Sequence, residues 1–295
     1  MKREMKIKTT AGSKIFDVIN YALLTLFCVT VIIPFIAQLT DSFTIDALLN
    51  SGRSFVFTGW IKDNWALLLT SNVMWRSAGV TLIVTLCGTL FQLFLSTTYA
   101  YPLSRKELPL RNFWTTLMLI TMFFSGGLIP TYFVYVSLGL RDTLPALFLG
   151  GMAAWNTLII RNFMMAIPNE LVESSRLDGA NEFTIFFRIM LPLSKAAIAT
   201  VALWLLVSFW NAWVPCMIYI TTPSKYVLQI ILRNMIQQAG SAAQTMFIGV
   251  AGINHSSQRG LEAAVTLFIT VPILCVYPFL QKYFVKGIMM GSIKG

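Results

Sequence analysis

The sequence predicts an all-α membrane protein with six transmembrane helices and both termini in the cytoplasm. Apolar residues make up 56% of the chain and charged residues only 12%, against roughly 25% charged residues in soluble domains. Six apolar stretches reach the roughly 20 residues that cross a bilayer as a helix. The 22 basic residues are also distributed unevenly between the segments that join these stretches.

The six apolar stretches lie at about 15–39, 73–101, 112–136, 143–165, 194–220 and 260–283. None alternates between apolar and polar residues as a barrel strand does, so each is expected to satisfy its backbone as a helix. The first is too long for a signal peptide and lacks a small-x-small cleavage site, which predicts a retained anchor. The predicted parts are a tail at 1–14, a transmembrane domain at 15–284 and a tail at 285–295.

The distribution of positive charge predicts the orientation. With the N-terminus inside, the cytoplasmic segments hold 15 of the 22 basic residues and the outer segments hold 7. This asymmetry follows the rule that inner loops are enriched in lysine and arginine. The net charge of +10 is therefore explained by topology, and we expect no nucleic-acid partner.

The third stretch contains a predicted helix break. Gly126 and Gly127 remove side-chain bulk, and Pro130 removes a backbone donor, so the helix should kink or partly unwind there. Inside a membrane such a break requires cover from protein or from a wet cavity. A packing kink and a cavity wall are both compatible with the pattern.

Polar residues interrupt three other stretches. Gln92, Asn156 and Asn211 should face the bundle or a wet cavity, because an uncompensated polar group in lipid is costly. Asn211 is flanked by Trp210 and Trp213. Aromatic faces beside an amide suit sugar rings, which offer C–H faces and hydroxyl groups. The alternative is hydrogen bonding between helices.

The cytoplasmic loop at 168–192 predicts two short helices. Asn169 can cap the first helix, and Glu173 lies in its first turn, where the helix dipole favours negative charge. Gly179, after Asp178, should end that helix in the left-handed conformation. A second helix should begin at Asn181 and carry Phe183, Phe186 and Phe187 until Leu191 and Pro192 turn the chain into the fifth stretch.

This loop has the features of a docking element. The small pair Ser174 and Ser175 gives the first helix a slim face that can enter a groove, and Glu173 offers a charge to a basic partner. The phenylalanines can fix the second helix to the rest of the chain. An ordinary inner loop with two amphipathic helices would explain the helices, but not the combination of spacing, glycine and terminal Leu-Pro.

The spacing resembles a known family. An acid-small-small triplet at 173–175, then Gly179, then Ile189-Met190-Leu191-Pro192 is similar to the EAA loop of bacterial ABC importer permeases, with Ser-Ser where Ala-Ala is more frequent. Segments 123–132, 138–143 and 281–291 resemble carbohydrate importer permeases of the maltose type. The branch handles oligosaccharides and polysaccharide fragments, including aldouronate and alginate.

The resemblance implies a type I ABC importer permease fold in the bacterial cytoplasmic (inner) membrane, surrounded by membrane lipid. It implies a subunit of an ATP-driven importer of oligosaccharides, including acidic ones such as alginate or aldouronate. The implied partners are a homologous permease, an ATPase dimer, an extracytoplasmic solute-binding protein and the oligosaccharide. ATP and Mg would bind only the ATPase subunits. The residues implied to contact the ATPase are Glu173, Ser174, Ser175, Asp178, Gly179, Leu191 and Pro192 in the loop, and Lys286, Gly287 and Gly291 in the tail.

No enzymatic or metal site is expected in the chain. The phosphate-binding motif G-x-x-x-x-G-K-[ST] is absent, and a single histidine, His255, cannot form H-E-x-x-H. Two other functions stay open. The loop motif also fits an ABC permease for peptides or amino acids. An ion-coupled secondary transporter would need ionisable residues near mid-membrane, whereas Asp17, Arg161 and Glu262 lie near the ends of the stretches.

Overall fold

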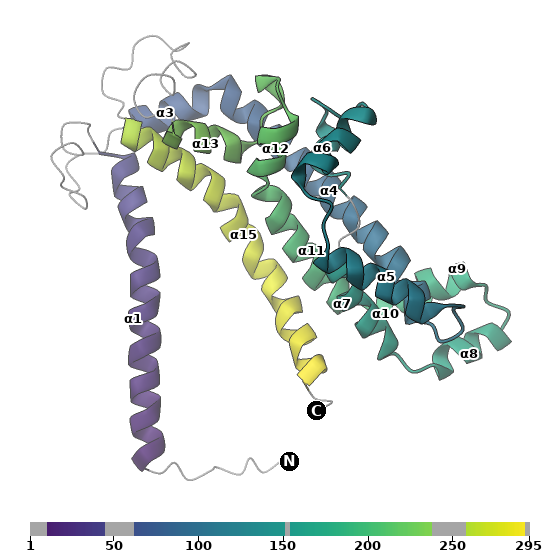
Figure 1. Ribbon diagram of the computed structural model, residues 1–295. Coiled ribbons are helices and arrows are strands. Elements are labelled where there is room, and N and C mark those ends of the chain that lie inside the picture. The colour runs from purple at the N-terminus through teal and green to yellow at the C-terminus, as the bar shows by residue number, and fades with distance from the viewer. Residues whose placement is uncertain (1–10, 45–61, 151–153, 238–257, 293–295) are drawn as a thin grey trace. The chain divides into compact units, whose positions relative to one another are not determined.

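The computed structural model describes residues 11–44, 62–150, 154–237 and 258–292, and all regular elements in these ranges are helices (Figure 1). The all-α prediction is confirmed for this part of the chain. The chain divides into two compact units, residues 1–70 with 243–268 and residues 71–242 with 269–295. The elements are α1 (Ala11–Ser42), α3 (Asp63–Thr70), α4 (Asn72–Ser104), α5 (Arg111–Phe123), α6 (Leu128–Ser137), the 3-10 turn η1 (Leu144–Leu147), α7 (Ala154–Met165), α8 (Glu170–Leu177), α9 (Glu182–Ile185), the π-helical turn η2 (Phe186–Met190), α10 (Leu191–Leu193), α11 (Lys195–Trp210), α12 (Trp213–Tyr219), the 3-10 turn η3 (Pro223–Lys225), α13 (Leu228–Gln237) and α15 (Gln258–Ser292).

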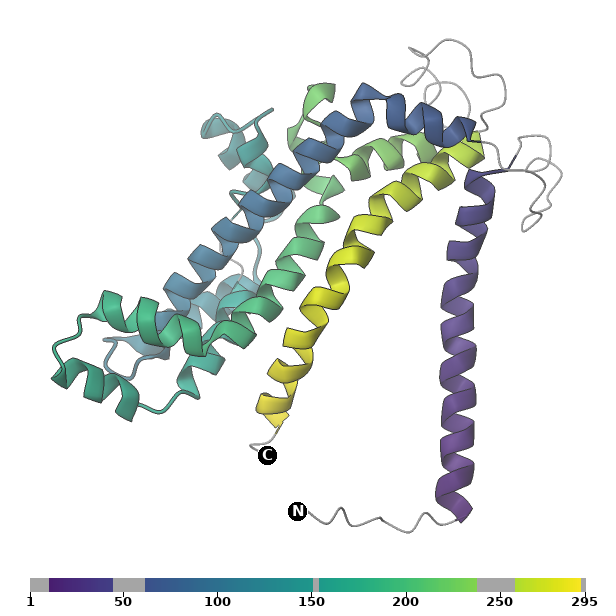
Figure 2. The ribbon, with the colours of Figure 1, turned by 180° about the vertical axis from the view of Figure 1, so that it is seen from behind.

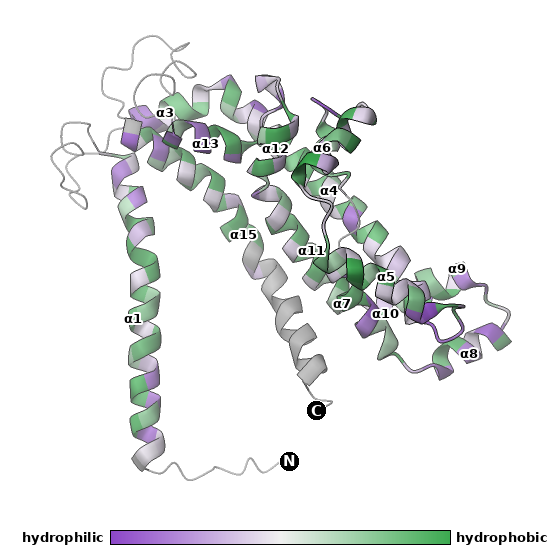
Figure 3. Ribbon diagram, viewed as in Figure 1, coloured by the Kyte–Doolittle hydropathy of each residue, from purple (hydrophilic) through white to green (hydrophobic). Residues whose placement is uncertain are grey.

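The first unit contains a long helix with an apolar surface. Helix α1 is mainly apolar (Figure 3), with a mean hydropathy of 2.3 over its most apolar window, and none of that window is buried. Its last turn is joined to α3 by hydrogen bonds. Asn64 Nδ2 donates to the carbonyl oxygen of Ser42 at 3.2 Å, and Trp65 Nε1 donates to the hydroxyl of Ser42 at 3.2 Å. The apolar length of α1 is therefore suited to hydrocarbon or to another chain.

Helix α4 is the central element of the second unit. It packs against α7 and α11, and Figure 2 shows it beside α11. Its buried face is mainly small and polar, with Ser77, Thr81, Thr85, Thr89 and Ser96. Small residues let helices approach closely in membranes, where dispersion contacts replace the hydrophobic effect. At Gly88 an added Cβ would lie 2.8 Å from the ring of Phe209 on α11.

Apolar clusters lie toward both ends of α4. Toward Ser104, Ala100 packs with residues of α7, α8, η2 and α11, among them Ile160, Val172 and Met190. Toward Asn72, the cluster consists of Val80, Val84, Leu147, Cys216, Ile220, Val227 and Ile230. Phe209 packs against both clusters, so its ring has little room to move.

The third predicted span is broken where the glycines lie. The chain bends by 109° between helices α5 and α6. Gly127, in the break, has φ 84° and ψ 166°, a backbone region almost restricted to glycine. A Cβ at Gly126 would meet nothing within 4 Å, and Pro130 is exposed. The described part of this chain therefore does not cover the break, which argues against a packing kink.

The other predicted spans differ in continuity. Gly12–Ser42, Asn72–Ser104 and Arg259–Val276 are each long and apolar enough to cross a membrane, and two bent helix pairs are further candidates. The stretch 194–220 is divided into α11 and α12 at Asn211 and Ala212. The stretch 143–165 contains η1 and α7, and the 12 residues of α7 extend only about 18 Å.

The contact at Gly88 yields a prediction with an internal control. Gly88→Leu should force α4 away from α11 and lower the free energy of unfolding by about 1–3 kcal/mol. Gly79→Leu, on the same helix with nothing within 4 Å of the added Cβ, should leave stability unchanged. Thermal unfolding of the two purified variants in detergent measures the difference. Equal melting temperatures would contradict the packing argument.

Candidate functional site

The loop at 168–192 contains a sharply terminated first helix. Gly179, which follows the C-cap residue Asp178 of α8, has φ 81°, so the left-handed conformation predicted for it is confirmed. Its N–H donates to the carbonyl oxygen of Arg176 at 3.0 Å, and the N–H of Ala180 donates to that of Ser175 at 2.9 Å. This pair of bonds is the Schellman arrangement that closes a helix. The chain therefore reverses at a fixed point.

The predicted cap at Asn169 is wrong. Asn169 has helical backbone angles, φ −67° and ψ −26°, and its side chain makes no capping hydrogen bond. A capping side chain reaches the N–H groups of the first turn from an extended backbone. Asn181 has that geometry, with φ −79° and ψ 166°, and its Oδ1 accepts from the N–H of Thr184 at 2.8 Å. The cap therefore belongs to the second helix.

The second helix is continuous through a π-helical turn. The N–H of Leu191 donates to the carbonyl oxygen of Phe186, five residues earlier, and the extra residue rotates the face that follows. Phe186 packs against the core, whereas Phe183 and Phe187 are exposed and line a groove of about 330 Å³ beside α4. Only one of the three phenylalanines thus fixes the helix to the rest of the chain.

The first helix has one anchor and a slim outer face. Val172 is 2% exposed and packs in the core. The residues predicted to contact a partner, Glu173, Ser174 and Asp178, are exposed. The Ser175 hydroxyl donates to the carbonyl oxygen of Leu171 at 2.6 Å. Leu177, which the sequence analysis missed, is 90% exposed at the tip. In the second helix Leu191 is half-buried and Pro192 is exposed.

A polar network fastens this loop to α4. Arg176 on α8 donates from Nη2 and Nε to Glu182 Oε1 at 2.8 and 3.1 Å. The Tyr101 hydroxyl on α4 donates to the other carboxylate oxygen of Glu182. This hydrogen bond, followed by that from Arg176, lowers the pKa of Glu182 from its ordinary 4.5. The stabilisation is therefore present above that ordinary value and is lost as the pH falls through the lowered one.

Arg105 completes the network at the end of α4. Its guanidinium carbon lies 5.0 Å from the centre of the Tyr101 ring, within the range of cation–π attraction. Opposite charges at 176 and 182, on either side of a glycine turn, are a signal that the sequence offers. The third member, Tyr101, lies 81 residues away from Glu182 along the chain, and only the fold brings it near.

Two of the three polar residues predicted to face the bundle or a wet cavity are buried. Gln92 Nε2 donates to the carbonyl oxygen of Gly150 at 3.0 Å, and Asn156 on α7 is buried. The position of Gln92 matches the hydrogen-bonding alternative. Gln92 therefore joins α4 to the segment that follows η1.

Asn211 lies in a different setting, at an exposed break between α11 and α12. Its Oδ1 accepts from Gln229 Nε2 at 2.9 Å. The Arg233 guanidinium lies over the Trp213 ring, 4.4 Å from its centre. Trp210 instead donates from Nε1 to the carbonyl oxygen of Ile269 at 3.1 Å and so serves helix packing. The break thus groups two amides, an indole face and a cation.

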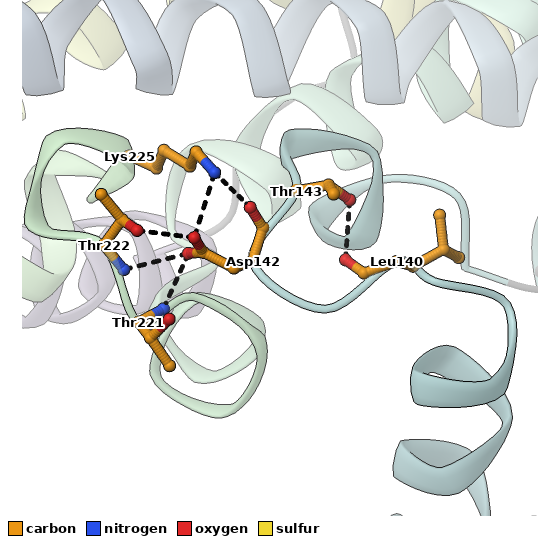
Figure 4. Close-up of polar contacts among 6 residues, drawn as sticks. All are labelled: Leu140, Asp142, Thr143, Thr221, Thr222 and Lys225. Carbon is orange, nitrogen blue, oxygen red and sulfur yellow. Dashed lines mark hydrogen bonds and ion pairs between the residues drawn. The ribbon is translucent and has the colours of Figure 1, made fainter.

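A second polar cluster, which we name the Asp142 clamp, joins two loops (Figure 4). The Asp142 carboxylate accepts from the N–H groups of Thr221 and Thr222 at 3.0 and 2.9 Å, from the Thr222 hydroxyl at 2.5 Å and from Lys225 Nζ at 3.1 Å. The Thr222 hydrogen bonds hold the pKa of Asp142 well below its usual range. Asp142 itself has φ 57°, a strained value that these bonds offset.

The clamp continues into a stack of tyrosines. The ring of Tyr135 of α6 stacks on the ring of Tyr219 of α12, with ring centres 4.5 Å apart. The ring of Tyr132 also stacks on that of Tyr219, with ring centres 6.1 Å apart. Asp142 N–H also donates to the carbonyl oxygen of Tyr219 at 2.8 Å. Helix α6, which has no buried residue, is therefore held mainly by aromatic faces and by the clamp.

The predicted tail residues Lys286, Gly287 and Gly291 lie within α15. The backbone is helical through all three, and α15 ends at Ser292. Their helix is thus an extension of the sixth apolar stretch, and they are distant in sequence from the 168–192 loop.

Comparison with known proteins identifies the family. The model of the binding-protein-dependent transport system inner membrane component matches residues 8–290. Protein LplC of Bacillus subtilis is 39% identical over 97% of both chains. The Bacillus subtilis polygalacturonan/rhamnogalacturonan transport system permease protein YtcP is 36% identical over 96% of this chain and 99% of its own.

A solved structure gives the same result for the fold. A bacterial ABC transporter involved in the import of the acidic polysaccharide alginate contains a chain with TM-score 0.85 and 27% identity, matched over 93% of this chain and 98% of that one. The family is the membrane-spanning part of ABC transport systems, in which separate subunits hydrolyse ATP. The chain belongs to the binding-protein-dependent transport system inner membrane components.

Proposed function

We propose that the chain is one of two permease subunits of an ATP-driven importer of oligosaccharides. The observation that carries the proposal is the exposed, slim helix α8, with one buried anchor at Val172 and an apolar tip at Leu177. Such a helix can enter a groove of an ATPase subunit without rearranging the core. The relatives' names, which refer to polygalacturonan, rhamnogalacturonan and alginate, support the carbohydrate class.

The proposed topology has six spans in the bacterial inner membrane, with both termini and the 168–192 loop in the cytoplasm. Its support is the positive-inside bias of 15 basic residues against 7. The bent pair α5 with α6 would count as one span, and α11 with α12 would form the fifth span, which the chain enters from the cytoplasmic helices α9 and α10. The domain of 15–284 then lies between two cytoplasmic tails, 1–14 and 285–295.

The partners follow from surfaces that this chain leaves exposed. The uncovered break at Gly126 fits a second, homologous permease or the wet path between the two. An ATPase dimer, which would hold ATP and Mg, would contact α8. In the proposed topology Lys286, Gly287 and Gly291 lie at the cytoplasmic end of α15, where they would contact it as well. An extracytoplasmic solute-binding protein would deliver the oligosaccharide to the outer face.

The polar network explains how movement of α8 would reach the path. Arg176 and Glu182 join the two loop helices at 2.8 Å, and Tyr101 joins Glu182 to α4. Because α4 packs against α7 and α11, a push on α8 is transmitted to three spans together. The network is thus a fastening between the docking helix and the bundle.

The proposed cargo is an acidic oligosaccharide, and the proposed path contact is the break at Asn211. The outer segments hold 7 basic and 5 acidic residues, an excess too small to select an anion. The side chains beside Asn211 favour an anion more directly. Arg233, over Trp213 at 4.4 Å, places a cation beside an aromatic face and the Asn211–Gln229 amide pair, which suits a uronate ring. Trp210 and Gln92 are weaker candidates because they donate hydrogen bonds within the chain, and Asn156 is weaker because it is buried.

The docking of α8 is tested by substitutions on its outer face. Ser175→Trp or Glu173→Lys should lower substrate-stimulated ATPase activity and uptake by about tenfold or more, because a lost or clashing contact of 1.4 kcal/mol suffices for that factor. The reconstituted complex is the material. Glu170→Gln, an exposed acid on the same helix, is the control. Wild-type coupling in both variants would refute the docking role.

The fastening is tested by Tyr101→Phe and Glu182→Gln. Each removes one link, and because exposed ion pairs contribute only about 0.2–1 kcal/mol, the melting temperature should change little. The amount of substrate imported per ATP hydrolysed should fall in both variants. Combining the two should add little further loss, because both break the same connection. Unaltered import per ATP would show that the network is structural only.

The path contact is tested with transport of labelled sugars into vesicles. Asn211→Ala should slow uptake about threefold to tenfold, the loss of one or two hydrogen bonds, with assembly unchanged. Arg233→Gln should slow uptake of a uronate oligosaccharide more than uptake of a neutral one. Arg76→Gln, an exposed outer arginine, controls for charge alone. Unchanged uptake in the Asn211 variant, with neutral maltooligosaccharides transported better than uronates, would count against both site and substrate.

A further inference from the structure

An apolar groove of about 490 Å³ lies beside the last turns of α4. Its lining is Tyr99, Pro102, Leu103, Leu108, Trp114, Leu117, Met118 and Thr121. Seven of these eight residues are apolar or aromatic. Trp114 and Leu117 expose much of their side chains, so the groove is open along α5. Its chemistry fits a hydrocarbon chain.

Two arginines converge at the end of this groove. Arg111, at the start of α5, and Arg161, on α7, both donate from Nε to the carbonyl oxygen of Leu103, at 3.1 and 2.9 Å. The groove-lining residue Leu103 therefore holds two guanidinium groups on one oxygen atom. Both side chains are half-buried, so water and salt screen their repulsion less than at an open surface.

The described residues provide no counter-ion for this pair. The ion pairs among them are Arg176 with Glu182 and Lys225 with Asp142. Arg111 Nη2 has a sulfur contact with Met165 at 3.4 Å, and Arg161 Nη1 a long bond of 3.4 Å to Asn162 Oδ1. A guanidinium carries five N–H donors, so these contacts use only part of the donor set.

Capping of the carbonyl groups at the end of α4 explains the presence of one arginine but not of two. The carbonyl groups at the end of α4 carry partial negative charge, equivalent to about half an elementary charge, and a single arginine would compensate it. The second guanidinium leaves a net positive charge beside an apolar groove. In the proposed orientation this end of α4 faces the cytoplasmic leaflet, whose lipids are anionic.

We propose that Arg111 and Arg161 bind the phosphate of an anionic phospholipid whose acyl chain occupies the groove. Arginine forms paired hydrogen bonds with phosphate oxygens, and basic pockets between helices on the cytoplasmic side are suited to anionic headgroups. The site includes the end of α4 that carries Tyr101, so bound lipid would stabilise the anchor of the loop network. The inference needs the proposed orientation but not the identity of the cargo.

The test is lipid retention by the complete complex, measured by native mass spectrometry after detergent exchange. Wild type should retain phosphatidylglycerol and lose phosphatidylcholine. Arg111→Gln with Arg161→Gln should reduce retained phosphatidylglycerol at least fivefold, whereas Lys106→Gln, which removes an exposed charge from the neighbouring loop, should not. Leu117→Trp, which fills the groove from an exposed position, should also reduce retention and tests the site if the double variant does not fold.

Added inorganic phosphate distinguishes a lipid from a free anion. If millimolar phosphate displaces phosphatidylglycerol, and Leu117→Trp has no effect on retention, the site takes phosphate alone and the lipid proposal is overturned. Equal retention by wild type and the arginine double variant would also overturn it. Loss of the second permease subunit from the Leu117→Trp complex, with lipid retention unchanged, would assign the groove to a protein interface. Transport assays do not enter this test, so its failure leaves the importer function intact.

Discussion

The close packing of α4 against α7 and α11 is the constraint on which the rest of this structure depends. It rests on small side chains and on Gly88, where the ring of Phe209 leaves no room for a Cβ. The cluster around Ala100, the loop network and the arginine pair all lie at the Ser104 end of α4, and the cluster around Val84 lies toward its Asn72 end. Since dispersion contacts hold membrane helices together, a displacement of α4 would alter both ends at once.

The sequence predicts best those features that depend on residues close together in the chain. Apolar length predicts the helices, Gly126 and Gly127 predict a break, and Gly179 predicts a left-handed turn, because each depends on local backbone chemistry. Asn169 shows the limit. A capping residue type is present, but its backbone is helical, and cap geometry is decided by how the preceding turn enters the loop.

Features made from distant segments were out of reach of sequence reasoning. Tyr101 meets Glu182 across 81 residues, and the Asp142 carboxylate meets Thr222 across 80. The two arginines converge on Leu103 from α5 and α7. Phe183 and Phe187 are exposed whereas Phe186 packs against the core. In each case the tertiary fold, rather than residue type, decides the contact.

The exposed tip at Leu177 has a consequence for the life of the protein before it is assembled. Covering a leucine that is 90% exposed contributes about 1.5–3 kcal/mol. If α8 docks into an ATPase subunit as proposed, a newly inserted chain would expose an apolar side chain that the assembled complex buries. Proteases that recognise exposed apolar segments would then remove surplus copies, which would tie the abundance of this subunit to the supply of the ATPase.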